Sequence, residues 1–151
     1  MELESPSFKE EGKIPKRYSC EGWDFSPPLA WNGVPEQTQS LALIMDDPDA
    51  PGGVFTHWVL FNMPPNNREL LEGISPVPRL ITGALQGKNG FGKFGYGGPC
   101  PPPGPPHHYR FTLYALDQQL ELKTDATQKQ VLSAMEGHIL TQSQLIGTYQ
   151  R

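Results

Sequence analysis

The apolar residues of this sequence gather in strand-length runs that end at turn-forming residues. Residues 40–45 form one continuous apolar run, which stops at an Asp-Asp-Pro turn signal. Residues 55–63 form a second run. Because side chains alternate across a strand, the pattern predicts one shared face for Phe55, His57, Val59 and Phe61. The opposite face is also largely apolar, which predicts a central strand covered on both sides.

Two more strands and one helix are predicted in the last third of the chain. Residues 109–116 alternate like the second run, and residues 140–149 predict a closing strand. Between them, residues 124–136 predict a helix, which Thr124 or Asp125 can cap at its N-terminus. The predicted apolar stripe of this helix consists of Val131, Leu132 and Met135.

Residues 83–106 form an unusual segment, which holds eight glycines and six prolines among 24 residues. A loop of this length in a compact domain is usually functional or disordered. Residues 90–95 spell G-x-G-x-x-G, but a proline-rich stretch follows where a dinucleotide site needs a helix. Residues 87–93 imitate a phosphate-binding loop, but Phe94 stands where Ser or Thr would hold magnesium. We therefore predict neither site, and no cofactor.

The composition favours a single, mostly β domain. The 151 residues include 16 glycines and 17 prolines, a joint share well above the background of about 12%. Both residues interrupt helices, which argues against a helical bundle, while a hydrophobic share of 36% is enough for a core. The length fits one domain over residues 1–151.

The net charge and the hydropathy of the chain limit the partners and the cellular location that can be expected. The formal net charge is −4, which argues against a broad basic surface that binds nucleic acid. Any site for an anion must therefore be confined to a small part of the surface. No apolar run approaches the roughly 20 residues of a transmembrane segment, and residues 1–4 do not resemble a signal peptide. We therefore expect a cytoplasmic protein. In a reducing compartment Cys20 and Cys100 are predicted to be free thiols, with a bond between them as the alternative.

A set of polar residues at the ends of the predicted strands carries the candidate chemistry. Asp47 and Asp49 lie in the turn after the first apolar run, and His57 lies inside the second. His107 and Tyr109 share one side of the next strand, where the Gly/Pro segment ends. Singly, each has a structural explanation, such as turn capping or a buried neutral histidine. Together they predict a pocket that binds an anion, with no metal site and no nucleophile beside a histidine.

Several motifs, in order along the chain, resemble the phosphatidylethanolamine-binding protein family. They resemble most its bacterial and archaeal members, which are labelled Raf-kinase-inhibitor-like. The motifs are Asp47-Pro-Asp-Ala-Pro51, His57-Trp58, Gly95-Tyr-Gly-Gly-Pro-Cys-Pro-Pro-Pro-Gly104 and His107-His-Tyr109. Residues 18–22, 26–31, 83–89 and 136–149 also match, so the resemblance spans nearly the whole chain.

The resemblance implies a fold and a ligand-binding site. The fold is a large antiparallel sheet packed on a smaller one, with a C-terminal helix and a small anion pocket. The residues that the resemblance assigns to this site are Asp47, Phe55, His57, Gly98, Pro99, His107 and Tyr109, and the pattern of polar residues at strand ends adds Asp49. One departure is His108, where the family usually has Arg. On a strand, residue 108 points away from its two neighbours, which would leave the pocket intact.

Three functions fit these observations. The leading one is a non-enzymatic, regulatory binding protein whose ligand is a phosphate ester, a phospholipid head group or another small anion. The alternative is an inhibitor of a protein kinase or serine protease that acts through its surface. The third is a hydrolase that uses the Asp and His side chains of the cluster. Whether the chain is a monomer or a homodimer stays open.

Overall fold

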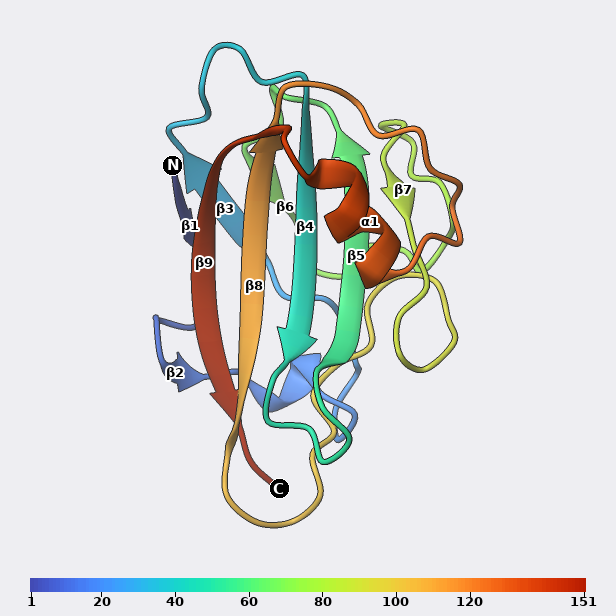
Figure 1. Cartoon of the computed structure of the whole chain (residues 1–151). Coiled ribbons are helices and arrows are strands. Elements are labelled where there is room, and N and C mark those ends of the chain that lie inside the picture. The colour runs from blue at the N-terminus through green and yellow to red at the C-terminus, as the bar shows by residue number, and fades with distance from the viewer.

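Two β-sheets and one α-helix make up the structure, a computed structural model that describes all 151 residues (Figure 1). The larger sheet has six strands in the order β2-β9-β8-β4-β5-β7. Its strands are β2 (Gly12–Lys13), β9 (Ile139–Tyr149), β8 (His107–Leu116), β4 (Ser40–Asp47), β5 (Phe55–Met63) and β7 (Leu85–Gln86). The smaller sheet, β1-β3-β6, consists of β1 (Glu2–Glu4), β3 (Leu29–Asn32) and β6 (Glu69–Leu70). A 3-10 helix, η1, covers Lys16–Tyr18, and α1 covers Gln128–Met135.

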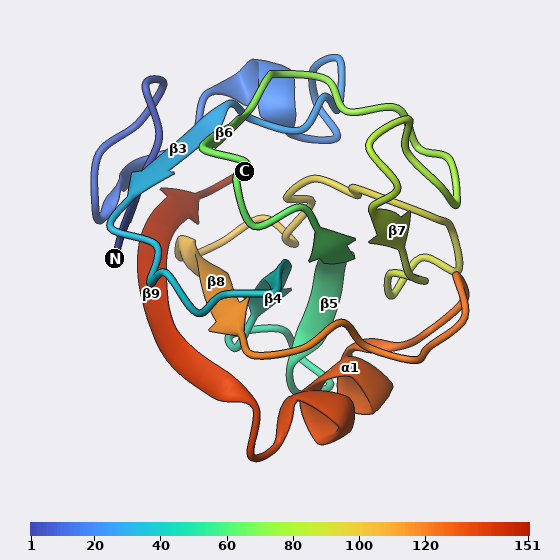
Figure 2. The same ribbon diagram turned by 90° about the horizontal axis from the view of Figure 1, so that it is seen from above.

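The larger sheet is covered on both faces. Figure 2 shows the smaller sheet on one side of it and α1 on the other. Accordingly, one apolar cluster lies between the two sheets and contains Phe111 and Leu43, while a second lies under α1 and contains Val131 and Phe61. All paired strands are antiparallel except β2 and β9. The predicted fold class, a mostly β protein with two sheets and a C-terminal helix, is confirmed.

A β-bulge in β5 changes the direction of its side chains. Met45 of β4 pairs with Trp58, and the next residue, Asp46, pairs with Thr56, so that His57 has no partner in the ladder. A bulge of this kind inserts one extra residue and re-aims the side chains beside it. Alternation holds from Trp58 onward, so Trp58 and Leu60 lie in the cluster between the sheets, and the bulge brings His57 to their face.

The predicted faces of this strand were therefore wrong. Val59 and Phe61 belong to the cluster under α1. His57 lies on the opposite face, where the centre of its ring is 5.2 Å from that of Tyr109, a member of the cluster between the sheets. The bulge thus turns His57 toward the ends of the central strands.

The helix begins later than predicted. Its N-cap is Thr127, whose hydroxyl accepts from the Gln130 amide while the Gln130 side chain accepts from the Thr127 amide. Thr124 and Asp125 lie before this capping box, and a tertiary contact holds that stretch in a loop: the Ala126 carbonyl accepts from the Lys88 amide at 3.1 Å. Of the predicted apolar stripe, two members are buried, while Leu132 is 39% exposed.

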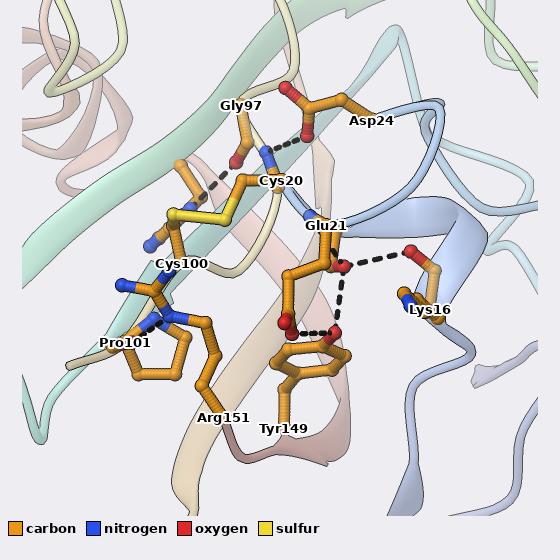
Figure 3. The surroundings of a disulfide bond; sticks show 12 residues. Lys16, Cys20, Glu21, Asp24, Gly97, Cys100, Pro101, Tyr149 and Arg151 are labelled. Carbon is orange, nitrogen blue, oxygen red and sulfur yellow. Dashed lines mark hydrogen bonds between the residues drawn. A yellow bond between two sulfur atoms is a disulfide. The ribbon is translucent and has the colours of Figure 1, made fainter. Parts of the chain in front are cut away.

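Cys20 and Cys100 form a disulfide bond, so the prediction of free thiols was wrong (Figure 3). Their Cα atoms are 5.4 Å apart although 80 positions separate them in sequence. The Cys20 amide also donates to the Pro99 carbonyl at 3.0 Å, so backbone pairing holds the two segments together. The redox state of a compartment carries no information on this proximity, and the cytoplasmic location stays a prediction. None of the helices has the length and apolar character needed to cross a membrane.

Candidate functional site

A small pocket lies where three central strands meet the Gly/Pro segment. Strand β4 ends at Asp47, β5 begins at Phe55, and β8 begins at His107, so their antiparallel order brings these residues to one edge of the sheet. The cavity has a volume of about 180 Å³. Its lining consists of Asp47, Ala50, Pro51, Phe55, His57, Phe91, Cys100, Pro101, Pro102, His107 and Tyr109.

Asp47 fixes the orientation of His107. One oxygen of the buried Asp47 carboxylate accepts from the Asp49 amide at 2.8 Å, which stabilises the turn after β4. Its other oxygen is 2.6 Å from Nδ1 of His107. Because a carboxylate can only accept, Nδ1 carries the hydrogen, and Nε2 is left as the other nitrogen of the ring.

His57 is held by the Gly/Pro segment, residues 83–106. Its ring Nδ1 lies 2.6 Å from the Gly97 carbonyl, which can only accept, so Nδ1 carries a hydrogen here too. The rings of Phe55, Phe91 and Tyr109 surround the imidazole edge-on. Burial lowers the pKa of His57, which favours the neutral imidazole at neutral pH. The neutral ring then has an unprotonated Nε2.

Tyr109 supplies a hydroxyl to the same space. Burial, followed by the nearby Asp47 carboxylate, raises the pKa of its phenol well above the ordinary value, so the phenol stays protonated and can donate. The Tyr109 hydroxyl and Nε2 of each of the two histidines make no hydrogen bond within the chain. None of the three atoms is fully buried, because Thr38 Oγ1 is the only fully buried side-chain polar atom that lacks a hydrogen-bond partner. These three polar atoms are therefore accessible, and all belong to side chains that line the pocket.

The structure thus brings together five residues expected for the site: Asp47, Phe55, His57, His107 and Tyr109. The other three expected residues, Asp49, Gly98 and Pro99, do not line the cavity and instead hold the segments that do. The amide of Gly98 donates to an Asp24 carboxylate oxygen at 2.8 Å, and the carbonyl of Pro99 accepts from the Cys20 amide.

Asp49 holds the turn after β4 against the start of β8. One of its carboxylate oxygens accepts from both the amide and Nδ1 of His108, each at 2.8 Å. These hydrogen bonds lower the pKa of Asp49 and raise the pKa of His108. The His108 side chain is exposed, which confirms that residue 108 points away from the pocket.

Sequence reasoning missed one wall of the pocket. Phe91 enters from the Gly/Pro segment, where the Asn89 side chain accepts from the Phe91 and Lys93 amides and forms a tight turn. An Asn followed by glycines is the local signal for such a turn. Nothing in the sequence placed that turn beside Phe55, whose ring centre is 4.9 Å from that of Phe91.

A larger groove, of about 620 Å³, lies beside α1 on the other face of the sheet. Its central charges are already paired: Arg110 binds both oxygens of Asp46, at 2.8 and 3.0 Å, and Gln128 donates to the same carboxylate. Such a satisfied network fits a structural role. The smaller pocket is therefore the better candidate site.

Comparison with known proteins identifies the family of this chain and supports the assignment of its fold. Residues 4–150 match the family model described as phosphatidylethanolamine-binding protein. This chain belongs to the phosphatidylethanolamine-binding protein family. The resemblance that the sequence motifs indicated is thus confirmed over almost the full length.

Relatives in the family match from end to end. A UPF0098 protein of Methanothermobacter thermautotrophicus is 52% identical, with 100% of this chain and 99% of the relative covered. The crystal structure of a phosphatidylethanolamine-binding protein homologue from Chlamydia trachomatis has a TM-score of 0.91 at 41% identity, covering 99% of this chain and 97% of that one. The structure of Escherichia coli YbcL, described as a member of the mammalian family, also has a TM-score of 0.91, at 32% identity and with 99% and 98% covered.

The donor set of the site does not form a metal centre. No group of three or more His, Cys, Asp or Glu side chains in the structure is arranged to hold a metal ion. Asp47 accepts from Nδ1 of His107, and the one cysteine in the lining, Cys100, is in the disulfide.

Proposed function

We propose that this family member binds a small phosphoryl group, or an anion of similar shape, in the pocket between Asp47 and Tyr109, and that it acts by binding rather than by catalysis. The observation that carries the proposal is the convergence of one phenol hydroxyl and two imidazole Nε2 atoms on a single small cavity. A phosphoryl oxygen can accept from the phenol and from any protonated imidazole.

The size and the apolar walls of the pocket support a small ligand or the end of a larger one. Drug-sized ligands occupy cavities of about 300–1,000 Å³, whereas this cavity holds about 180 Å³. Phe55, Phe91 and the Pro101-Pro102 pair form the remaining wall. A phosphate ester with a short substituent, or a phospholipid head group, fits this combination.

The lining offers little for hydrolysis. It contains no Ser or Thr, and its only cysteine is in the disulfide. Its one hydroxyl belongs to Tyr109, whose raised pKa makes a phenolate nucleophile scarce. These features favour binding over turnover. The alternative function, inhibition of a kinase or a serine protease through the surface, stays a prediction.

The test is calorimetric titration with inorganic phosphate and with phosphoethanolamine. The variant His107→Ala is expected to bind about 10- to 100-fold more weakly, because it loses a hydrogen bond to a charged group worth about 1.5–3 kcal/mol. The matched control is His138→Ala, because His138 also pairs with an aspartate, Asp117, but lies outside the pocket. Equal affinity of the two variants would contradict the proposal. So would hydrolysis of phosphoethanolamine by the wild type that is lost in His107→Ala but kept in His138→Ala.

Anion binding is expected to strengthen as the pH falls from about 8 toward about 5.5. Burial lowers the pKa of His57, so the free protein holds a neutral ring whose Nε2 repels an anion. A bound anion favours the protonated ring, so binding takes up a proton. The gain in affinity is then largest at a pH below the pKa that His57 has in the free protein. It is lost as the pH rises through the higher pKa that His57 has in the complex. The charged groups that act on His57 are the carboxylates of Asp47, Asp24 and Asp46, and no Lys or Arg lines the pocket.

Dimethyl phosphate is the suitable probe for this linkage. It keeps a single charge, whereas a phosphate monoester gains a second charge near pH ~6 and would confuse the measurement. Calorimetry in two buffers of different protonation enthalpy gives the number of protons taken up. A dissociation constant independent of pH, with no proton uptake, would exclude this role for the histidines.

A further inference from the structure

One peptide group connects His57 to a carboxylate outside the pocket. The carbonyl of this group belongs to Gly97 and accepts from His57 Nδ1 at 2.6 Å. Its amide belongs to Gly98 and donates to Asp24 Oδ1 at 2.8 Å. Figure 3 shows the hydrogen bonds that end on Gly97 and on Asp24, on either side of this backbone segment. Asp24 itself does not line the pocket.

The surrounding contacts give this peptide group little freedom to move. On the strand side, the Gly97 amide donates to the His57 carbonyl at 2.9 Å, so the two residues exchange two hydrogen bonds. On the other side, the Cys20–Cys100 bond ties the segment before Asp24 to the same loop. Asp24 adopts a left-handed backbone conformation, with φ of 58°, which a tight turn requires here.

We propose that Asp24 is a positioning residue for His57, acting through the Gly97–Gly98 peptide group to hold the imidazole with Nδ1–H toward the loop and Nε2 free for the ligand. A charged acceptor on the amide polarises the peptide group and strengthens the hydrogen bond that its carbonyl accepts. The relay therefore fixes the orientation of the ring: the neutral ring carries its hydrogen on Nδ1, and the protonated ring that binds an anion presents Nε2–H to the ligand. Its effect on ligand affinity rests on the proposed function, whereas its effect on the imidazole does not.

Charge adds a second effect in the same direction. The Asp24 carboxylate favours the protonated form of His57 and so opposes the lowering of its pKa by burial. Asp47 and Asp46 act in the same sense from the strand side. On the loop side, Lys93 faces Asp24, whose own pKa burial raises. Because Asp24 is exposed to solvent, its charge is screened, and we expect the effect on affinity to be moderate.

Nitrogen NMR of the histidine rings tests the positioning role without a ligand. Three variants are compared with the wild type: Asp24→Ala, Asp24→Asn and, as matched control, Asp117→Asn, whose carboxylate binds His138 in a similar way. In the wild type, His57 is expected as the Nδ1–H tautomer. Asp24→Ala should give a mixture of tautomers. Asp24→Asn, which keeps an acceptor but loses the charge and is the milder change for folding, should keep the tautomer and titrate at lower pH.

Titration with inorganic phosphate supplies the second measurement. Asp24→Ala is expected to bind about 3- to 10-fold more weakly, Asp24→Asn less so, and Asp117→Asn as the wild type does. If the His57 spectra and titration of both Asp24 variants equal those of Asp117→Asn, the positioning role is refuted. If the wild type binds no phosphate, the proposed function fails, while the His57 spectra still decide the role of Asp24.

Discussion

Loss of the Cys20–Cys100 bond is expected to lower the free energy of unfolding by about 4 kcal/mol and the melting temperature by roughly 10 °C. The bond closes a loop across 80 sequence positions, and in the chain-entropy model so long a loop greatly restricts the unfolded chain. The measurement is thermal and urea unfolding of the wild type, with and without dithiothreitol, and of the double variant Cys20→Ser with Cys100→Ser.

The double variant serves as its own control, because dithiothreitol should not change its melting temperature. The bond also anchors the pocket, since Cys100, Pro101 and Pro102 line it. We therefore expect weaker phosphate binding in the reduced protein, even at temperatures where it remains folded. A loss of less than about 1 kcal/mol on reduction would show that other contacts hold this loop in place.

Gly98→Ala is expected to cost about 1–3 kcal/mol of stability and to weaken phosphate binding more than ten-fold. A Cβ at this position would lie 2.3 Å from the Tyr18 carbonyl oxygen and 2.4 Å from Asp24 Oδ1. The backbone segments on the two sides cannot separate freely, because the disulfide joins Cys20 to Cys100. The loop must therefore shift, and with it the Gly97 carbonyl that holds His57.

The control for this variant is Gly52→Ala, because a Cβ at Gly52 would meet nothing within 4 Å and Gly52 also lies in a loop beside the pocket. Urea unfolding and calorimetric titration of the two variants separate the effect of the clash from the general effect of glycine replacement. Equal stability and equal affinity of the two variants would show that the loop tolerates displacement at Gly98.

Local sequence patterns were sufficient for the four long strands, β4, β5, β8 and β9, and for the family. The apolar runs at residues 55–63 and 109–116 predicted β5 and most of β8, because a strand that is buried on both faces leaves a continuous apolar run of strand length. The Asp-Pro-Asp motif, Phe55 and His57 in the second apolar run, and the His and Tyr after the Gly/Pro segment together predicted five residues that line one pocket. The order of strands in the sheet then brought them together.

Details that depend on contacts between distant residues were not predictable in this way. The bulge that turns His57 out of register depends on how β5 pairs with β4, and no residue in β5 alone specifies it. The helix begins at Gln128 with the local Thr127–Gln130 capping box, whereas the residues before it are held in a loop by the Lys88 amide, which donates to the Ala126 carbonyl from 38 positions away.

The sequence by itself therefore determined the four long strands, the fold class, the family and five residues of the pocket lining, since each leaves an apolar run or a motif of adjacent residues. Only the tertiary structure decided the Cys20–Cys100 bond and the contact of Asp24 with the loop that holds His57. Both join segments that lie more than 70 positions apart. The physical reason is that the distance between such segments depends on the packing of all the strands between them, which no local pattern encodes.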